Sequence, residues 1–340
     1  MIRIIDLRDD TGSEFYAKLV NRGQTEHGDI LRLVNDIVDN VRANGDKAVF
    51  EYTRKFDGAE LDAASLKVSK QEIDAAYDKI DGRLLDVIRR AKTNIESFHR
   101  KQKENSWFST EKNGVILGQL YRAIETVGVY VPGGTAAYSS SVLMNVIPAK
   151  VAGVEKIVMV TPPKKEGSIN PAILVAANEA GVDEIYKVGG AQAVAALAFG
   201  TETMPRVDKI TGPGNIYVAT AKRFVYGYCD IDMVAGPSEI MVVADESANP
   251  KFVAADLLSQ AEHDALASSI LVTTSEKLAV EVQRELENQT ALLARKNIIE
   301  KSIGDYGAVI ITGSLDQAVD AVNKIAPEHL ELCVKEPFSL

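Results

Sequence analysis

Two short groups of residues in this 340-residue chain have the types and spacing needed for acid–base or metal chemistry. Glu262-His263 and Glu328-His329 each put a carboxylate beside an imidazole, which supplies two groups of different pKa. Gln260 and His263 are three residues apart in a predicted helix, so they share one face, and both side chains can bind a metal. From spacing alone, Glu328-His329 is either an acid–base pair or an exposed polar turn. Gln260 and His263 together supply only two donors, whereas a zinc site has about four.

Three glycine-rich turns each lie between a predicted strand and a predicted helix. They are YVPGG at 130–134, VGGAQ at 188–192 and GPGN at 212–215. Glycine lets backbone N–H groups approach a phosphate, and the N-terminus of the following helix attracts an anion. None of the turns is the G-x-G-x-x-G dinucleotide fingerprint. Each turn alone is either a tight connection or part of a nucleotide site, and the three together favour a nucleotide site.

The two cysteines, Cys229 and Cys333, are too few for a disulfide-stapled scaffold or a cysteine-rich zinc module. A thiol can trap an aldehyde for hydride transfer. The sequence predicts no histidine or helix N-terminus beside either cysteine that would lower the pKa of its thiol. Both are therefore interpreted as small buried hydrophobes.

The elements that must position these residues change in kind along the chain. The first hundred residues are mostly helical, with an apolar stripe over 31–41, a break at Asn44-Gly45 where Asp46 can cap the next helix, and a capping box at Ser69. From about 124 onward, short strands and helices alternate. This alternation predicts an α/β fold of two Rossmann-like parallel-sheet domains, one inserted in the other, with a helical N-terminal region.

The amino-acid composition limits the kinds of partner that the chain is expected to bind. The chain has 48 acidic and 38 basic residues, a formal net charge of −10. This balance disfavours nucleic acid and anionic membranes, since both attract positive charge. No apolar run is long enough to span a membrane, and the N-terminus lacks the pattern of a signal peptide. The expected compartment is the cytoplasm.

The sequence resembles the histidinol dehydrogenase family over essentially its whole length. The resemblance is carried by long segments in the family's order: VGVYVPGG, VGGAQAVAALAFGTE, VDKITGPGN, AGPSEI, DLLSQAEHD and APEHL. It implies a zinc-dependent, four-electron oxidation of L-histidinol through histidinal to L-histidine, with NAD as the oxidant. It also implies a homodimer.

The resemblance implies a role for each residue that matches the family's motifs. The NAD-contacting residues would be Tyr130, Gln192 and Asn215. The zinc ligands would be Gln260 and His263, and the catalytic acid–base pair would be Glu328 and His329. The residues expected to contact substrate are Ser238, Gln260, His263 and His329.

We predict three parts: an N-terminal segment over 1–24, a zinc and substrate domain over 25–130 with 238–340, and an inserted NAD-binding domain over 131–237. The family's chain continues beyond the point that matches Leu340. The resemblance implies that this later part supplies an aspartate, a histidine and a glutamate to the site. We therefore expect a C-terminally truncated enzyme with little zinc affinity and little turnover. The alternative is a folded, non-catalytic remnant that binds only nucleotide or a partner.

Overall fold

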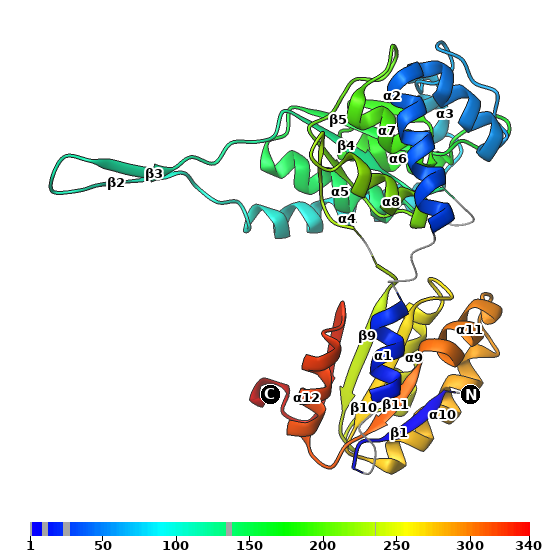
Figure 1. Ribbon diagram of the computed structural model, residues 1–340, viewed down its shortest axis with the longest axis vertical. Helices are drawn as coiled ribbons and strands as arrows, with labels where there is room; N and C mark the ends of the chain where they lie inside the picture. Colours follow the sequence, from blue (N-terminus) through cyan, green and yellow to red (C-terminus); the bar gives the residue numbers. More distant parts are fainter. Residues whose placement is uncertain (1, 9–12, 23–27, 134–137, 235) are drawn as a thin grey trace. The chain divides into compact units, whose positions relative to one another are not determined.

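The computed structural model describes residues 2–8, 13–22, 28–133, 138–234 and 236–340. The chain forms two compact units. The terminal unit combines Met1–Glu26 with Gly236–Leu340, and the central unit is His27–Ala235. Each unit is built on one parallel five-stranded sheet (Figure 1).

In the terminal unit the strand order is β1-β11-β10-β9-β12. The strands are β1 (Arg3–Asp6), β9 (Glu239–Ala244), β10 (Ser268–Thr273), β11 (Ala308–Ile311) and β12 (His329–Cys333). The helices are α1 (Ser13–Arg22), α9 (Pro250–Ala261), α10 (Glu276–Thr290), α11 (Lys296–Tyr306) and α12 (Leu315–Ile325), followed by the short 3₁₀ helix η1 (Pro337–Ser339). One apolar core joins the sheet to α9, α10 and α11, and a second joins the opposite face to α1 and α12. The terminal unit is thus a three-layer sandwich.

In the central unit the strand order is β6-β5-β4-β7-β8. The strands are β4 (Thr126–Tyr130), β5 (Lys156–Thr161), β6 (Glu184–Lys187), β7 (Lys209–Thr211) and β8 (Asp230–Ile231). The helices are α2 (Gly28–Asp57), α3 (Lys70–Tyr77), α4 (Gly82–Arg100), α5 (Ser139–Ala152), α6 (Pro171–Ala180), α7 (Gly190–Phe199) and α8 (Ile216–Val225). Helices α2, α7 and α8 share one core, and α3, α4, α5 and α6 share the other. A separate antiparallel hairpin, β2 (Trp107–Thr110) and β3 (Ile116–Gln119), projects from the central unit (Figure 1).

The predicted fold class is confirmed, but the predicted domain boundaries differ from these units. Residues 27–130, predicted to join the C-terminal part, lie in the central unit. The reason is packing: the apolar stripe of α2, including Val34 and Val41, is buried against α7 and α8, and β4 is the middle strand of the central sheet. The predicted N-terminal segment belongs to the terminal unit, because β1 pairs with β11 and Phe15 is buried in its core.

Local signals in the sequence mark most helix ends correctly. The Ser69 capping box is present, and α6 begins at Pro171 as predicted. The helix break falls at Gly45, which has a φ of 52°. The expected cap by Asp46 is wrong: Thr203 donates a hydrogen bond to its carboxylate, and its own N–H donates to Glu202 Oε2 at 2.8 Å.

The prediction of no membrane span agrees with the helices of the structure. No helix among the described residues is both long enough and apolar enough to cross a bilayer. The longest helix, α2, is amphipathic, because its buried stripe faces the central core and its other residues face solvent.

Candidate functional site

The carboxyl edge of the central sheet brings the three glycine-rich turns together. An ideal Cβ on Gly133, after β4, would lie 2.3 Å from the side chain of Pro162, after β5. A Cβ on Gly189, after β6, would lie 2.5 Å from the same proline. A Cβ on Gly212, after β7, would lie 2.1 Å from the carbonyl oxygen of Tyr130. Glycine is needed at these positions because four consecutive strand ends approach one another closely. Gly134 lies outside the described residues.

Tyr130 ends β4 at this edge. Its phenol oxygen accepts a hydrogen bond of 3.1 Å from the backbone N–H of Gly190, which opens α7. Burial, with a smaller contribution from the charge of Asp57, raises the pKa of Tyr130 to about 12, so the phenol is neutral at pH 7. The hydrogen bond ties the turn after β6 to the end of β4.

The turn after β7 is held by an ion pair whose lysine is buried. The Lys222 ammonium contacts the Asp232 carboxylate and donates a 3.1 Å hydrogen bond to the carbonyl oxygen of Gly212. Asp232 accepts a 2.8 Å hydrogen bond from the Gly212 N–H. At the end of this turn Asn215 caps α8 by accepting from the N–H groups of Tyr217 and Val218. The predicted residue Asn215 is therefore exposed but fixed in direction.

Gln192, on the first turn of α7, is the clearest sign of a binding site here. Its side chain is 1% exposed, and neither its amide nitrogen nor its amide oxygen has a hydrogen-bond partner in the structure. Thr161 and Thr211, at the ends of β5 and β7, also have buried hydroxyl oxygens without a partner. Unpaired buried polar atoms are costly and rare. Their concentration at one edge fits a polar ligand that would pair them.

The strand order explains why the site forms at this point. From β4 the chain crosses to β5 and β6 on one side, and then returns to place β7 on the other side of β4. Ligands in such open sheets bind at this reversal, beyond the carboxyl ends of the strands. Tyr130 and Gly212 flank the reversal.

Sequence reasoning missed Asp57, the last residue of α2. Its Oδ2 is buried without a partner, and burial raises the pKa of its carboxyl to about 6. It interacts electrostatically with Tyr130. In the sequence, Asp57 looks like part of a glycine-terminated helix end, and only the packing of α2 against the central sheet places it near the other residues.

The terminal unit gathers its predicted residues at the opposite kind of edge, where strands begin. His329 is the first residue of β12 and pairs in register with Ile240, the second residue of β9. The N–H of Glu239 donates a 3.3 Å hydrogen bond to Glu328 Oε2, and Ser238 immediately precedes β9. The Glu328 and His329 side chains are about half exposed, with 3.9 Å between Oε1 and Nε2. Segments 89 residues apart are thereby joined.

Gln260 and His263 lie at the end of α9. The helix ends at Ala261, so the prediction that His263 is helical is wrong, and His263 lies two residues beyond the helix. The two residues remain neighbours, because the His263 N–H donates a 3.1 Å hydrogen bond to the Gln260 carbonyl oxygen. Arg295 donates to the His263 carbonyl at 3.3 Å. The His263 side chain is exposed and that of Gln260 half-buried, so both can reach a ligand.

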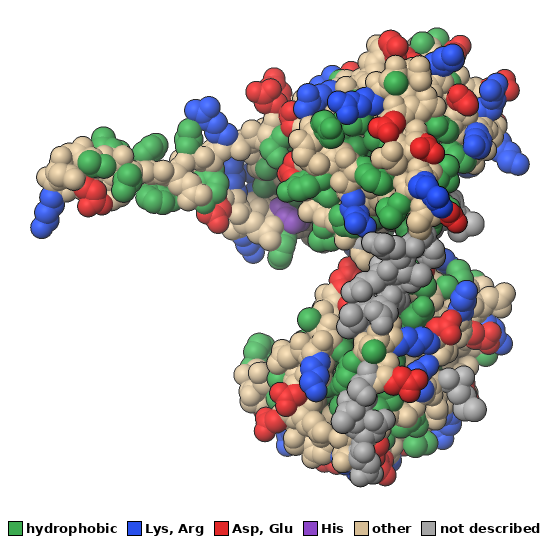
Figure 2. Space-filling model, in the orientation of Figure 1, with side chains coloured by type: hydrophobic (Ala, Val, Ile, Leu, Met, Phe, Trp, Pro, Cys, Tyr) green, Lys and Arg blue, Asp and Glu red, His purple; other side chains and the backbone are tan. Residues whose placement is uncertain are grey.

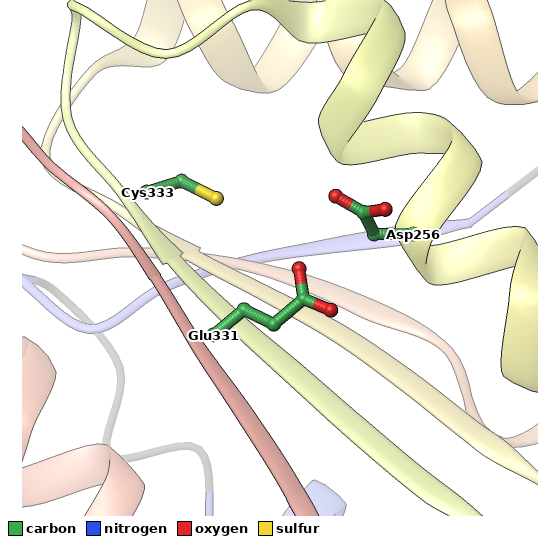
Figure 3. A group of neighbouring side chains, drawn as sticks. All are labelled: Asp256, Glu331 and Cys333. Atoms are coloured by element: carbon green, nitrogen blue, oxygen red, sulfur yellow. The ribbon is translucent and has the colours of Figure 1, made fainter. Parts of the chain in front are cut away.

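A further cluster lies between α9 and β12 (Figure 3). One donor atom from each of Asp256, Glu331 and Cys333 lies within 4.8 Å of the others. Burial, then the neighbouring Asp256 carboxylate and its hydrogen bond, raise the pKa of Glu331. Asp256 precedes Gln260 by about one helical turn, and Glu331 follows His329 by two residues, so the pair borders the predicted residues.

Neither thiol has the character of a nucleophile. Burial raises the pKa of Cys229 to about 11. Burial also raises the pKa of Cys333, with help from the nearby Glu331 and Asp256 carboxylates. A reactive cysteine needs a lowered pKa, so neither thiol is activated. Cys229 is buried as predicted, whereas Cys333 is only partly buried.

A shallow depression of about 610 Å³ lies elsewhere on the central unit. It is lined around the α2 kink and the segment after α7, including Arg42, Gly45, Glu202 and Arg206. It contains none of the predicted site residues. The predicted site residues therefore lie outside this depression.

Two parallel five-stranded sheets, one interrupting the other in sequence, define an α/β protein of the architecture on which many dehydrogenases are built. The histidinol dehydrogenase family model matches residues 20–340. The chain belongs to this family, whose members are oxidoreductases of histidine biosynthesis that use NAD and zinc.

Comparison with individual proteins gives the same family. The chain is 55% identical over 338 residues to the histidinol dehydrogenase of Clostridium acetobutylicum, covering 99% of this chain and 78% of that enzyme. It is 56% identical over 340 residues to that of Caldanaerobacter subterraneus subsp. tengcongensis, covering 79% of the relative. The crystal structure of histidinol dehydrogenase from Elizabethkingia anophelis matches 99% of this chain and 77% of that chain, with a TM-score of 0.93 and 41% identity.

Proposed function

We propose that this protein oxidises L-histidinol to L-histidine through histidinal, with two NAD⁺ as the electron acceptors, one for each hydride. Family membership supports the reaction class. The observation that carries the assignment of residues is the edge of the terminal unit, where Ser238, Glu328 and His329 come together from distant parts of the chain.

We assign NAD binding to the carboxyl edge of the central sheet. Gln192 would pair its two buried amide atoms with the cofactor, and Tyr130 and Asn215 flank the same strand ends. The N-termini of α7 and α8 lie at this edge, and the positive ends of their helix dipoles suit a pyrophosphate. Bound NAD supplies the hydride acceptor, and the protein's part is to orient it.

Glu328 and His329 are assigned the proton transfers. The His329 imidazole takes the hydroxyl proton of histidinol as the neighbouring C–H bond gives up its hydride. The Glu328 carboxylate takes a proton from the water that adds to the aldehyde, and the hydrate then loses the second hydride. Their half-exposed positions let both groups exchange protons with solvent between steps.

Gln260 and His263 fit zinc only in part. They would supply an amide oxygen and an imidazole nitrogen to a metal that serves as a template for the substrate. Zinc sites use about four donors, and affinity depends on the complete set. We infer that a polypeptide of these 340 residues alone holds zinc weakly and turns over little.

The test measures zinc content and histidinol-dependent NADH formation on the same sample of the 340-residue chain. The measurement is repeated on the chain extended by the C-terminal part of the Clostridium acetobutylicum enzyme. Zinc binding and turnover in the extended protein support the proposal if turnover is lost on replacing His329 and kept on replacing the half-buried His99. An extended protein that binds zinc and NAD but does not oxidise histidinol would contradict it and favour the non-catalytic alternative.

A further inference from the structure

Asp57, the last residue of α2, has a hydrogen-bond acceptor that the protein itself does not use. Its Oδ2 is buried and has no hydrogen-bond partner. The hydroxyl oxygen of Thr53, one helical turn earlier on the same face of α2, is also buried without a partner. A buried carboxylate oxygen without a donor is destabilising, because it has lost its hydration and gained no bond. A ligand that brings a donor to Asp57 would remove this penalty.

Tyr130 has the complementary donor. Its phenol oxygen accepts from the Gly190 N–H at 3.1 Å, and its own proton has no acceptor among the residues that the structure describes. Asp57 and Tyr130 interact electrostatically, yet no hydrogen bond joins the Asp57 Oδ2 to the phenol. A hydroxyl group is both a donor and an acceptor. A ligand hydroxyl between the two side chains would accept from Tyr130 and donate to Asp57.

The surroundings of Asp57 leave its negative charge uncompensated. Burial raises the pKa of Asp57 to about 6, and no neighbouring cation lowers it. Asp232, an acid at the same edge, is by contrast paired with the Lys222 ammonium and the Gly212 N–H. Figure 2 shows basic and acidic side chains interspersed over the visible face of the central unit, rather than gathered into one basic patch. The electrostatics beside Asp57 therefore suit a neutral hydroxyl and not an anion.

We propose that Asp57 and Tyr130 bind the 2′-hydroxyl of the adenosine ribose of NAD, and that the Asp57 carboxylate makes the site select NAD over NADP. The inference rests on the assignment of NAD binding to this edge and adds the residue that decides between the two cofactors. In NADP this hydroxyl carries a phosphate, whose charge is about −1.5 to −2 at pH 7. The phosphate oxygens cannot donate to Asp57, and the two negative charges repel each other.

Gln192 indicates which of the two riboses lies here. An ideal Cβ on Gly190, whose N–H binds the Tyr130 phenol, would lie 2.6 Å from Gln192 Oε1, so the amide borders the same corner. Its unpaired donor and acceptor match adenine, which presents the N6 amino donor beside the N7 acceptor. The nicotinamide must face the substrate to accept a hydride, whereas Gln192 is 1% exposed and can enclose a base. The ribose beside an enclosed adenine is the adenosine ribose.

The experiment measures the affinity of the 340-residue chain for three probes by calorimetric titration. The probes are NAD, NADP and the form of NAD that contains 2′-deoxyadenosine. The titrations are made at pH 8, where a carboxyl with a pKa of about 6 is ionised. We expect NAD to bind at least about 100-fold more tightly than NADP. The deoxy form should bind about 10–100-fold more weakly than NAD, as for the loss of a hydrogen bond to a charged group.

Two variants of Asp57 separate its charge from its hydrogen bond. Asp57→Asn keeps the shape of the side chain and removes the charge, so the ratio of the NADP and NAD dissociation constants should fall at least about tenfold. In Asp57→Ala only the Tyr130 bond to the hydroxyl remains, so the penalty for the deoxy form should fall at least about threefold. Asp36→Asn makes the same charge change at an exposed site of α2 and should alter neither ratio.

The outcomes distinguish this inference from the assignment of the NAD site. An unaltered NADP-to-NAD ratio in Asp57→Asn would overturn the inference, as would an undiminished penalty for the deoxy form in Asp57→Ala. Either result would leave the NAD site in place if Gln192→Met still weakens NAD binding. A chain that does not bind NAD would overturn the assignment of the site and this inference together. Unchanged far-UV spectra of the variants show that they are folded.

Discussion

The two units carry sheets of the same kind, and their candidate site residues gather at opposite edges of these sheets. In the central unit, buried and unpaired polar groups such as Gln192 gather where the strands end. In the terminal unit, exposed groups such as His329 gather where the strands begin and where α9 ends. A Rossmann-like sheet therefore does not fix where a site lies. The loops and helix ends that carry the reactive side chains decide it.

The largest expected effect comes from the terminal unit's edge. In the extended protein, His329→Asn should lower kcat by about 10²–10⁴-fold, because the imidazole that accepts the hydroxyl proton is gone. NAD affinity, which is assigned to the other unit, should not change. Steady-state NADH formation and calorimetric NAD titration measure the two quantities, and His99→Asn is the control. A large change in NAD affinity would show that the two edges are not separate in function.

The next largest effect is expected from glycine substitutions at the carboxyl edges of the two sheets. A Cβ at Gly212, whose φ is 116°, would lie 2.1 Å from the Tyr130 carbonyl oxygen. A Cβ at Gly313, after β11, meets only ordinary contacts at 3.6 Å. Gly212→Ala should lower the free energy of unfolding by about 3–5 kcal/mol, and Gly313→Ala by less than about 1 kcal/mol. Gly227→Ala, with a φ of 101° and open space, isolates the conformational cost. Urea denaturation measures the free energy of unfolding of each variant. If Gly212→Ala and Gly227→Ala lose the same amount, the contact with the Tyr130 carbonyl oxygen adds nothing to the cost at Gly212.

We expect Gln192 to lower the stability of the protein without NAD and to strengthen NAD binding. Gln192→Met keeps the side chain's approximate volume and removes two buried polar atoms that lack partners. The free energy of unfolding should rise by about 1–2 kcal/mol without NAD, while the Kd for NAD should rise by about tenfold. Urea denaturation and calorimetry measure these changes. The exposed Gln71→Met is the control and should change neither. A variant that loses stability would mean that Gln192 is paired within the protein.

The smallest effect concerns Asp57, whose carboxyl pKa is about 6 in the folded protein against an ordinary 3.8. The folded state holds this proton more tightly, so stability falls as the pH rises from about 4 to about 6 and then levels off. Asp57→Asn should remove this loss, gaining about 1 kcal/mol at pH 8 and almost nothing at pH 4, since solvent screens a half-buried group. Asp36→Asn, exposed on the same helix, is the control. A gain that is independent of pH would rule out titration of Asp57 as its cause.

Sequence patterns predicted elements well where their signals are local. Ser69 and Pro171 mark helix starts through contacts within one turn, and the structure keeps both. The hairpin was missed because its apolar residues stand on both faces and follow no single period. Helix α11 was missed because only a few of its residues, such as Ile299 and Ile303, are buried.

By itself, the sequence determined the α/β class, the family and the identity of the residues that carry the motifs. These depend on residue types and short spacings along the chain. Tertiary structure alone decided that α2 belongs to the central unit, that Asp57 lies near Tyr130, and that Glu328 meets the start of β9. The physical reason is that each depends on which buried faces pack together. Contacts between residues far apart in the chain leave no local pattern in its sequence.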